Sequence, residues 1–324
     1  MVDLEHIEKA RDRISGSIRP TPLVSSPSLS EFCGVPVHLK LEHLQATGSF
    51  KLRGAFNALL QLTDDERARG VVAASTGNHG RALSFAAQAC GVKATICMSS
   101  LVPDNKVVEI RRLGADVHIV GRSQDEAQEE AERLVLSQGL YQIPPFDHPA
   151  IIAGQGTLGL EIIDALPDVA TVLIQLSGGG LASGVARAIK SKRPEARAIG
   201  VTMERGAAMK ASLDAGHPIQ VEEFESLADS LGGGIGLHNR LTFAMCGDLL
   251  DDVILLSEAE IAAGIRHAYL QEREIVEGAG AVGIAALLAN KVSSLRGPTV
   301  TVLSGRNIDM QLHRRIITDE ASPK

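Results

Sequence analysis

The feature that most constrains the fold of this chain is a repeated alternation of short apolar runs with longer amphipathic stretches. The expected strands are Val35–Leu41, Val71–Ala74, Ala94–Met98, Val117–Val120, Val172–Leu176, Ala198–Val201, Val253–Leu256 and Thr299–Leu303. The expected helices include Asp104–Leu113, Gln124–Leu136, Ile151–Ala165 and Leu181–Lys190. Such alternation is typical of βαβ units, whose parallel strands are joined by crossover helices. The sequence therefore predicts an α/β fold with mostly parallel sheets, and functional loops at the carboxyl ends of the strands.

Length and composition restrict the protein further. A chain of 324 residues suggests about two domains, and the 44% of hydrophobic residues are enough for a sizeable core. The formal net charge is -7, the basic residues are dispersed, and aromatic residues are only 3% of the chain. This composition argues against nucleic-acid binding and favours a small-molecule partner. The proline-containing stretch Tyr141–Pro149 is the best candidate for a crossing between domains.

Cysteine usage and the N-terminus predict a cytoplasmic protein. Cys33, Cys90, Cys97 and Cys246 lie far apart and form no CxxC pair, so we expect buried, reduced cysteines. The first residues are charged throughout and lack the apolar centre of a secretory signal. No run approaches the roughly 20 apolar residues of a membrane span, so no membrane partner is expected.

A lysine loop, Thr47–Ala55, is the first of four loops that carry chemistry. It reads Thr-Gly-Ser-Phe-Lys-Leu-Arg-Gly-Ala and places Lys51 at the start of a helix, beside Phe50. Burial and the helix dipole would lower the pKa of this lysine and favour a nucleophilic free amine. Taken alone, the loop is more typical of a solvated lysine in a first helical turn than of a buried nucleophile.

A glycine loop follows the strand that ends near Leu176. Ser177, Gly178, Gly179, Gly180 and Leu181 lead directly into an expected helix. Three glycines let several backbone N–H groups converge at a helix N-terminus, which suits a phosphate group. A tight strand-to-helix turn is the alternative, although two glycines would be enough for turning.

The remaining two loops offer hydroxyl and amide groups. Ser75, Thr76, Gly77, Asn78 and His79 follow the strand Val71–Ala74 and would suit a substrate carboxylate, although Asn78 alone fits an N-cap better. His79 is more typical of a structural histidine, so it is not placed among the catalytic residues. Ser304, after the last strand, has a hydroxyl that could face a ring nitrogen.

In this order, the motifs GSFKLRGA, STGNHG, SGGGL and SGRN resemble those of the serine/threonine dehydratase family of pyridoxal-phosphate enzymes (fold type II), which also includes serine racemase. The resemblance spans nearly the whole chain. It implies a large cofactor domain, residues 1–69 and 147–324, and a small mobile domain, residues 70–146. It also implies a homodimer or homotetramer.

The resemblance also implies roles for individual residues. Lys51 would hold pyridoxal phosphate covalently and move the Cα proton of the substrate. The other expected cofactor contacts are Phe50, Asn78, Ser177, Gly178, Gly179, Gly180, Leu181, Gly234, Glu277 and Ser304. The expected substrate contacts are Ser75, Thr76, Gly77, Asn78 and His79. The implied reaction removes water from a β-hydroxy amino acid and gives a 2-oxo acid and ammonia.

Two positions depart from the family pattern. Thr76 stands where racemases carry a serine that acts as a base, which keeps Thr76 as a catalytic candidate but puts racemase activity in doubt. Glu204 matches a divalent-cation ligand of relatives, yet Lys210 replaces the expected aspartate, so we predict no metal there. Three stretches, Leu41–Gln45, Met203–Met209 and Ser304–Met310, look most like the hydroxyectoine-utilization dehydratase subgroup, which would imply a hydroxyectoine-derived substrate.

Three other functions remain as alternatives. A dinucleotide-binding oxidoreductase is suggested by Gly278-Ala279-Gly280-Ala281-Val282-Gly283, which fits GxGxxG, but the charged residues before it do not form a strand signal. A turn into a packed helix is the better interpretation. A catalytically idle binding protein would predict decay of the lysine loop, which is intact. A β-replacement enzyme would share the fold, but the lysine loop resembles the dehydratase branch more closely.

Overall fold

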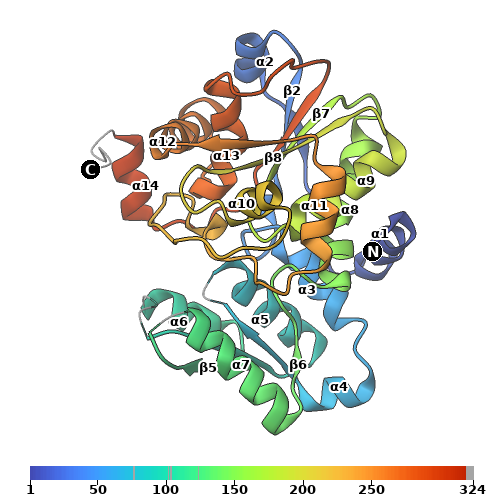
Figure 1. Ribbon diagram of the computed structural model, residues 1–324, viewed down its shortest axis with the longest axis vertical. Helices are drawn as coiled ribbons and strands as arrows, with labels where there is room; N and C mark the ends of the chain where they lie inside the picture. Colours follow the sequence, from blue (N-terminus) through green and yellow to red (C-terminus); the bar gives the residue numbers. More distant parts are fainter. Residues whose placement is uncertain (76, 101, 103, 123, 319–324) are drawn as a thin grey trace.

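Two sheets organise the protein, as the computed structural model shows (Figure 1). The structure describes residues 1–75, 77–100, 102, 104–122 and 124–318. The larger sheet has the strand order β1 (Leu23–Ser25), β2 (Val37–Lys40), β10 (Thr299–Val302), β7 (Thr171–Gln175), β8 (Arg197–Met203) and β9 (Asp252–Leu256). Every neighbouring pair in it is parallel except β1 with β2.

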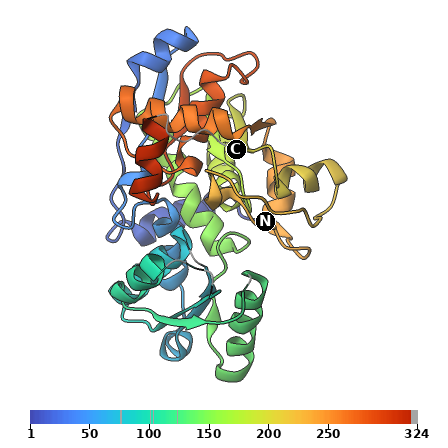
Figure 2. The same cartoon turned by 90° about the vertical axis from the view of Figure 1, so that its left-hand side faces the viewer.

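The smaller sheet is built from one continuous part of the chain. Its order is β5 (Asp116–Ile119), β4 (Ala94–Met98), β3 (Val71–Ala74) and β6 (Tyr141–Gln142), and all its pairs are parallel. It lies below the larger sheet in Figures 1 and 2. Residues 143–148, which we call the crossing segment, run from β6 to the helix that starts at Pro149. These sheets confirm the predicted fold class, two domains with mostly parallel sheets flanked by helices.

Helices cover both faces of the sheets. The α-helices are α1 (Leu4–Ile14), α2 (Pro27–Cys33), α3 (Lys51–Leu59), α4 (Asp64–Arg69), α5 (Asn78–Cys90), α6 (Asp104–Arg112), α7 (Gln124–Gln138), α8 (Pro149–Ala165), α9 (Gly180–Lys192), α10 (Ala208–Ala215), α11 (Leu241–Leu249), α12 (Glu258–His267), α13 (Gly278–Leu288) and α14 (Met310–Ile317). Short turns of other helix types are η1 (Glu42–Leu44), η2 (Asp229–Leu231) and the π-helix η3 (Ala268–Glu272).

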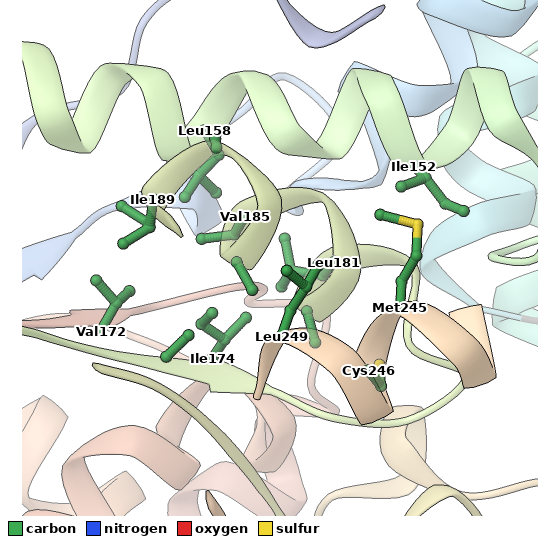
Figure 3. Packing of buried hydrophobic residues seen from close by; sticks show 14 of the residues in the cluster. Ile152, Leu158, Val172, Ile174, Leu181, Val185, Ile189, Met245, Cys246 and Leu249 are labelled. Carbon is green, nitrogen blue, oxygen red and sulfur yellow. The ribbon is translucent and has the colours of Figure 1, made fainter. Parts of the chain in front are cut away.

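Three large apolar clusters hold these layers together. On one face of the larger sheet, Val172 and Ile174 of β7 pack beneath Val185 and Ile189 of α9, with Leu158 of α8 above them (Figure 3). The other face is covered by α12 and α13. A third cluster joins α3 and α8 to the smaller sheet, since residues of all three are buried together. The helix that begins with Lys51 is therefore fixed between the two sheets.

The structure corrects several details of the sequence prediction. The strands β1 and β6 were not predicted, because they have only three and two residues and no apolar run. The cysteines are all free, as expected, but Cys33 and Cys90 are partly exposed and only Cys97 and Cys246 are buried.

The GxGxxG segment forms the start of α13 and follows irregular backbone, as the sequence interpretation predicted. Its glycines allow close packing, because a Cβ on Gly278 would lie 2.0 Å from the Leu227 carbonyl oxygen. A Cβ on Gly283 would lie 1.8 Å from Thr301 Oγ1. Both positions are buried in protein contacts, which explains the glycines without a dinucleotide.

Candidate active site

The lysine loop is bound to the loop after β10 by backbone hydrogen bonds. Ser49 forms a β-bridge with Gly305, and the Phe50 N–H donates to the Ser304 carbonyl oxygen at 3.1 Å. Gly48 has a φ of 78°, a left-handed conformation that favours glycine. These contacts fix the chain just before α3, so Lys51 begins that helix at the carboxyl edge of the larger sheet.

The Lys51 side chain is partly exposed, and its ammonium lies between the two sheets. Its Nζ donates to the Pro145 carbonyl oxygen at 2.8 Å and lies 5.3 Å from the centre of the Phe50 ring. Burial lowers the pKa of Lys51 to about 8, and the Glu277 carboxylate partly offsets this shift. About a tenth of such amines would be neutral at pH 7, far more than for a solvated lysine.

A network of amide and carboxylate groups connects the lysine loop to α5. Asn307 Nδ2 donates to the Thr47 carbonyl oxygen at 3.0 Å and to Asn78 Oδ1 at 2.5 Å. Asn78 Nδ2 in turn donates to Glu277 Oε1 at 2.7 Å, and the Asn307 N–H donates to Glu277 Oε2 at 3.0 Å. The network therefore joins segments that lie far apart in sequence.

Glu277 is the buried carboxyl group of this network. Burial and the nearby Asp229 carboxylate raise the pKa of Glu277 to about 7, against the opposing effect of the Asn78 hydrogen bond. A carboxyl group with this pKa changes its charge near neutral pH. Gly305 is required beside it, because a Cβ there would lie 2.6 Å from Glu277 Oε1.

The glycine loop, which we call the anion cradle, turns the chain into α9 and packs closely against its neighbours. A Cβ on Gly178 would lie 2.3 Å from Phe146 Cδ1, and one on Gly179 would lie 2.9 Å from Thr242 Cβ. Gly179 also has a φ of 86°, which favours glycine. Ser177 precedes the cradle, and the first N–H groups of α9, including that of Leu181, have no acceptor within the helix. This is a ready anion site.

The loop between β3 and α5 supplies further polar groups. The Gly80 N–H donates to Ser75 Oγ at 3.0 Å, and Gly77 immediately precedes the helix. Thr76, a predicted catalytic and substrate-binding residue, lies outside the described residues. The placement of this loop at the carboxyl end of β3 agrees with the position expected for a ligand site.

His79 is buried and its Nε2 donates to the Ile143 carbonyl oxygen at 2.8 Å. Burial, with the neighbouring Lys51 ammonium, lowers the pKa of His79 to about 3, so the ring is neutral at pH 7. Because a carbonyl only accepts, the proton lies on Nε2, and Nδ1 is a buried acceptor without a partner among the described residues. The hydrogen bond to the crossing segment supports a structural role for His79 better than a role as a general base.

Two predicted cofactor residues have less defined surroundings. Ser304 is 3% exposed, and its carbonyl oxygen holds the lysine loop. Gly234 lies in an irregular segment between η2 and α11, and no contact among the described residues links it to Lys51. That segment is fixed at one point by Asn239, whose Nδ2 donates to the Ile235 carbonyl oxygen at 3.1 Å.

Sequence reasoning missed three groups of this site. Asn307 belongs to the SGRN loop, but only its amide contacts across the fold reveal its role. The Pro145 carbonyl is a backbone group that no motif marks. In the sequence, Phe146 was only one residue of the predicted domain crossing, and nothing indicated that its ring lies against the glycine loop.

At the position compared with a divalent-cation site, Lys210 Nζ binds the Asp214 carboxylate at 2.5 and 2.6 Å. Glu204 lines the same surface cleft. Within the described ranges, no three His, Cys, Asp or Glu side chains gather in a way that could hold a metal ion.

Comparisons with known proteins cover nearly the whole chain. Residues 14–305 match the family described as pyridoxal-phosphate dependent enzyme. A Sinorhizobium fredii protein that carries the name putative threonine dehydratase is 68% identical, over 98% of this chain and 95% of its own length. An L-threonine ammonia-lyase from Thermotoga maritima is 44% identical, over 98% of this chain and 78% of its own length.

Solved structures give the same result for the fold. A maize serine racemase has a TM-score of 0.91 at 30% identity and covers 99% of both chains. The processed form of threonine deaminase isoform 2 from Solanum lycopersicum has a TM-score of 0.89 at 35% identity, over 99% of this chain and 95% of its own. In the part of the chain that the structure describes, no helix is long and apolar enough to span a membrane.

Proposed function

Because this chain belongs to the family of pyridoxal-phosphate dependent enzymes, we propose that it removes water from a β-hydroxy amino acid such as L-threonine or L-serine. The products would be a 2-oxo acid and ammonia. Pyridoxal phosphate is the cofactor of this protein, and the protein is a lyase. The observation that carries the proposal is Lys51, an amine whose pKa is lowered to about 8 and which bonds the Pro145 carbonyl oxygen. The next residue, Phe146, packs against the glycine loop.

The residues at the site fit this cofactor. Gly178 and Gly179 turn the chain at the N-terminus of α9, where the first N–H groups have no acceptor within the helix and would stabilise a phosphate. Thr47 Oγ1 and Ser49 Oγ, in the lysine loop, are buried and have no hydrogen-bond partner among the described residues. Orphaned hydroxyl groups of this kind are expected where a polar ligand completes the site.

Lys51 is the group that would move protons. The cofactor, when bound, supplies the electron sink that makes the Cα proton of an amino acid acidic. A pKa of about 8 lets Lys51 Nζ accept that proton near neutral pH, and the Pro145 carbonyl oxygen is available to orient the amine. The Phe50 ring lies 5.3 Å from the same ammonium, close enough for a cation–π contact.

The other residues would bind and orient. We assign Asn78, Glu277 and Ser304 to the ring of the cofactor, and the residues Ser177–Leu181 to its phosphate. The loop Ser75–His79 would receive the substrate carboxylate, since it opens α5. Ser304 is neutral and, unlike a carboxylate, would not keep a ring nitrogen protonated, which favours loss of the β-substituent over transamination.

The substrate proposal rests first on relatives named threonine dehydratase or L-threonine ammonia-lyase. A finer proposal is a hydroxylated amino acid derived from hydroxyectoine, supported only by the resemblance of three short stretches. Amino-acid racemisation is the second candidate, and the similarity to maize serine racemase supports it.

Titration of the purified holoenzyme with L-threonine tests these proposals. We expect the visible absorbance band of the cofactor to shift while 2-oxo acid accumulates in the same cuvette. A band that never responds would keep the cofactor and direct the search to hydroxyectoine-derived amino acids. Formation of D-allo-threonine, the product of inversion at Cα, without 2-oxo acid, measured by chiral chromatography, would support the racemase instead.

We also propose the organisation of the working enzyme. Residues 70–146 would form the small domain that closes over substrate, and residues 1–69 and 147–324 the cofactor domain. We expect a homodimer or homotetramer in the cytoplasm. This organisation rests on the family resemblance.

A further inference from the structure

The crossing segment contains an aspartate that caps a helix from a distance. Asp147 Oδ1 accepts from the N–H groups of Leu241 and Thr242, both at 2.9 Å, and Asp147 Oδ2 accepts from the Arg240 N–H at 3.0 Å. The residue at the N-cap position of α11, Arg240, makes no side-chain capping bond. Asn239 Oδ1 accepts from the next N–H group, that of Phe243, at 2.9 Å. The first three N–H groups at the start of α11 therefore depend on a carboxylate supplied by a segment that lies far earlier in the chain.

The capped end of α11 supports the glycine loop from behind. Thr242 and Cys246 lie so close to Gly179 that an added Cβ there would meet them at 2.9 and 3.0 Å. Ser183, in the first turn of α9, donates to the Thr242 carbonyl oxygen at 3.4 Å. A shift of the first turn of α11 would therefore move the atoms that contact Gly179.

The neighbour of Asp147 in sequence supports the same loop from another side. The Phe146 ring would contact an added Cβ on Gly178 at 2.3 Å, and its backbone would meet one on Gly180 at 3.0 Å. The glycine loop is thus enclosed between Phe146 and the end of α11 that Asp147 caps. Both supports come from two consecutive residues of the crossing segment.

We propose that Asp147 is a positioning residue for the anion cradle, which it shapes by holding α11 against Gly179. The proposal rests on the assignment of the residues Ser177–Leu181 to the cofactor phosphate. Asp147 itself does not contact the phosphate. Its effect would be specific for the phosphate part of the cofactor, because the ring is assigned to Asn78, Glu277 and Ser304.

The test compares pyridoxal phosphate with pyridoxal, which lacks the phosphate group. Both are titrated into cofactor-free protein, and binding is followed by the visible absorbance of the bound ring. For Asp147→Ala we expect affinity for pyridoxal phosphate to fall about tenfold, within the range that loss of a helix cap produces, and affinity for pyridoxal to stay unchanged. Asp147→Asn keeps an acceptor oxygen and should lose only part of this affinity.

A matched control is Asp309→Ala. Asp309 also caps a short helix with its carboxylate, since it accepts from the N–H groups of Gln311 and Leu312 at 2.9 and 2.8 Å. This variant should leave the ratio of the two affinities at the wild-type value, even if its melting temperature falls.

The outcomes separate this inference from the proposed function. If the wild-type protein binds pyridoxal as tightly as pyridoxal phosphate, the phosphate assignment is wrong. If the wild type discriminates and Asp147→Ala weakens both ligands equally, or neither, the positioning role is overturned. Should Asp147→Ala fail to fold, an unchanged affinity ratio in Asp147→Asn would overturn it in the same way.

Discussion

At the scale of single residues, burial brings two pKa values close together: it lowers that of Lys51 to about 8 and raises that of Glu277 to about 7. The Glu277 carboxylate raises the pKa of Lys51, so its replacement by glutamine should lower that pKa further. Competitive acetylation of cofactor-free protein between about pH 6 and 10, read by mass spectrometry, measures the midpoint at Lys51. We expect a midpoint near about 8 in the wild type and a lower one in Glu277→Gln. A wild-type midpoint in the usual lysine range would contradict the buried site.

Asn307 gives a second prediction at this scale. Asn307→Ala removes the donor to both Thr47 and Asn78, so we expect kcat/KM for L-threonine to fall about tenfold, as for a buried acceptor left without a partner. Asn307→Asp has the same size but no amide donor, and it should be at least as damaging. Full activity of Asn307→Asp would show that the donor is not needed.

Local sequence signals mark the candidate reactive residues more clearly than they mark the residues around them. Lys51, Asn78 and the glycine loop carry local signals, because each lies at a helix start beside glycine or hydroxyl residues. Asn307 and Pro145 act through partners far away in sequence, and no local pattern encodes such contacts. The roles assigned to the predicted residues stay predictions until the cofactor is seen in place.

At the scale of elements, the glycine loop and the crossing segment have to fit together. We expect Gly178→Ala to weaken pyridoxal phosphate binding about 10- to 100-fold, because the new Cβ would meet the Phe146 ring and overpacking costs about 1 to 3 kcal/mol. The double variant with Phe146→Ala should recover part of this loss. Gly247→Ala is the matched control, since its Cβ would make only an ordinary contact of 3.4 Å with Leu213. Equal losses in the single and double variants would mean that Phe146 is not the obstacle.

Helix α3 is held by a buried cluster of charges. Arg53, 1% exposed, donates to Glu42 at 2.7 and 2.8 Å and to Glu161 at 2.6 and 2.9 Å, while Lys40 donates to Glu161 at 2.5 Å. These bonds tie α3 to β2, η1 and α8. Because Arg53 closely follows Lys51 in the same helix, the cluster also holds the first turn of α3, where Lys51 lies.

Removal of Arg53 should therefore be costly and dependent on pH. Arg53→Met leaves two carboxylates without their main partner, a change that typically costs about 3 to 5 kcal/mol. In the wild type, burial would raise the pKa of Glu42, but Arg53 outweighs it and the pKa is lowered. That contribution to stability is present above the unfolded pKa and is lost as pH falls. In the variant, protonation of Glu42 relieves the unpaired charge, so the deficit should shrink on acidification.

Urea unfolding at neutral and at mildly acidic pH measures this deficit. Arg53→Lys keeps the charge but not the forked geometry, and it should fall between the wild type and Arg53→Met. A deficit that grows on acidification would contradict the assigned role of Glu42.

At the scale of the whole molecule, the alternation of apolar runs and amphipathic stretches determined the fold class correctly. Each predicted strand corresponds to an observed one within a few residues, because buried parallel strands are almost entirely apolar, as in β3 and β7. The sequence could not predict that β1 pairs antiparallel at the edge, or the strand order, since both depend on long-range packing. Nor could it show how the crossing segment joins the two sheets at the site.

Several exposed apolar side chains lie on neighbouring elements of the larger domain. These side chains, which we call the apolar face, are Leu44, Tyr269, Leu270, Ile275 and Met310. Contacts show that their elements adjoin: His43 Nε2 lies 2.7 Å from Glu274 Oε2, and the rings of Tyr269 and His313 are 5.4 Å apart. Exposed apolar side chains that cluster can mark an interaction surface.

The expected homo-oligomer gives this face a partner, because a second copy would bury the same apolar residues against each other in a two-fold interface. We expect the wild type to sediment at twice the mass of the chain or more. Leu270→Glu would place a charge in that interface and should shift the protein toward the monomer, since an unpaired buried charge costs several kcal/mol. Leu136→Glu is the matched control, because Leu136 is even more exposed, at 88%, and lies on α7, away from this face. If both variants keep the wild-type mass in analytical ultracentrifugation, the apolar face is not where two chains meet, and the oligomer, if one forms, uses another surface.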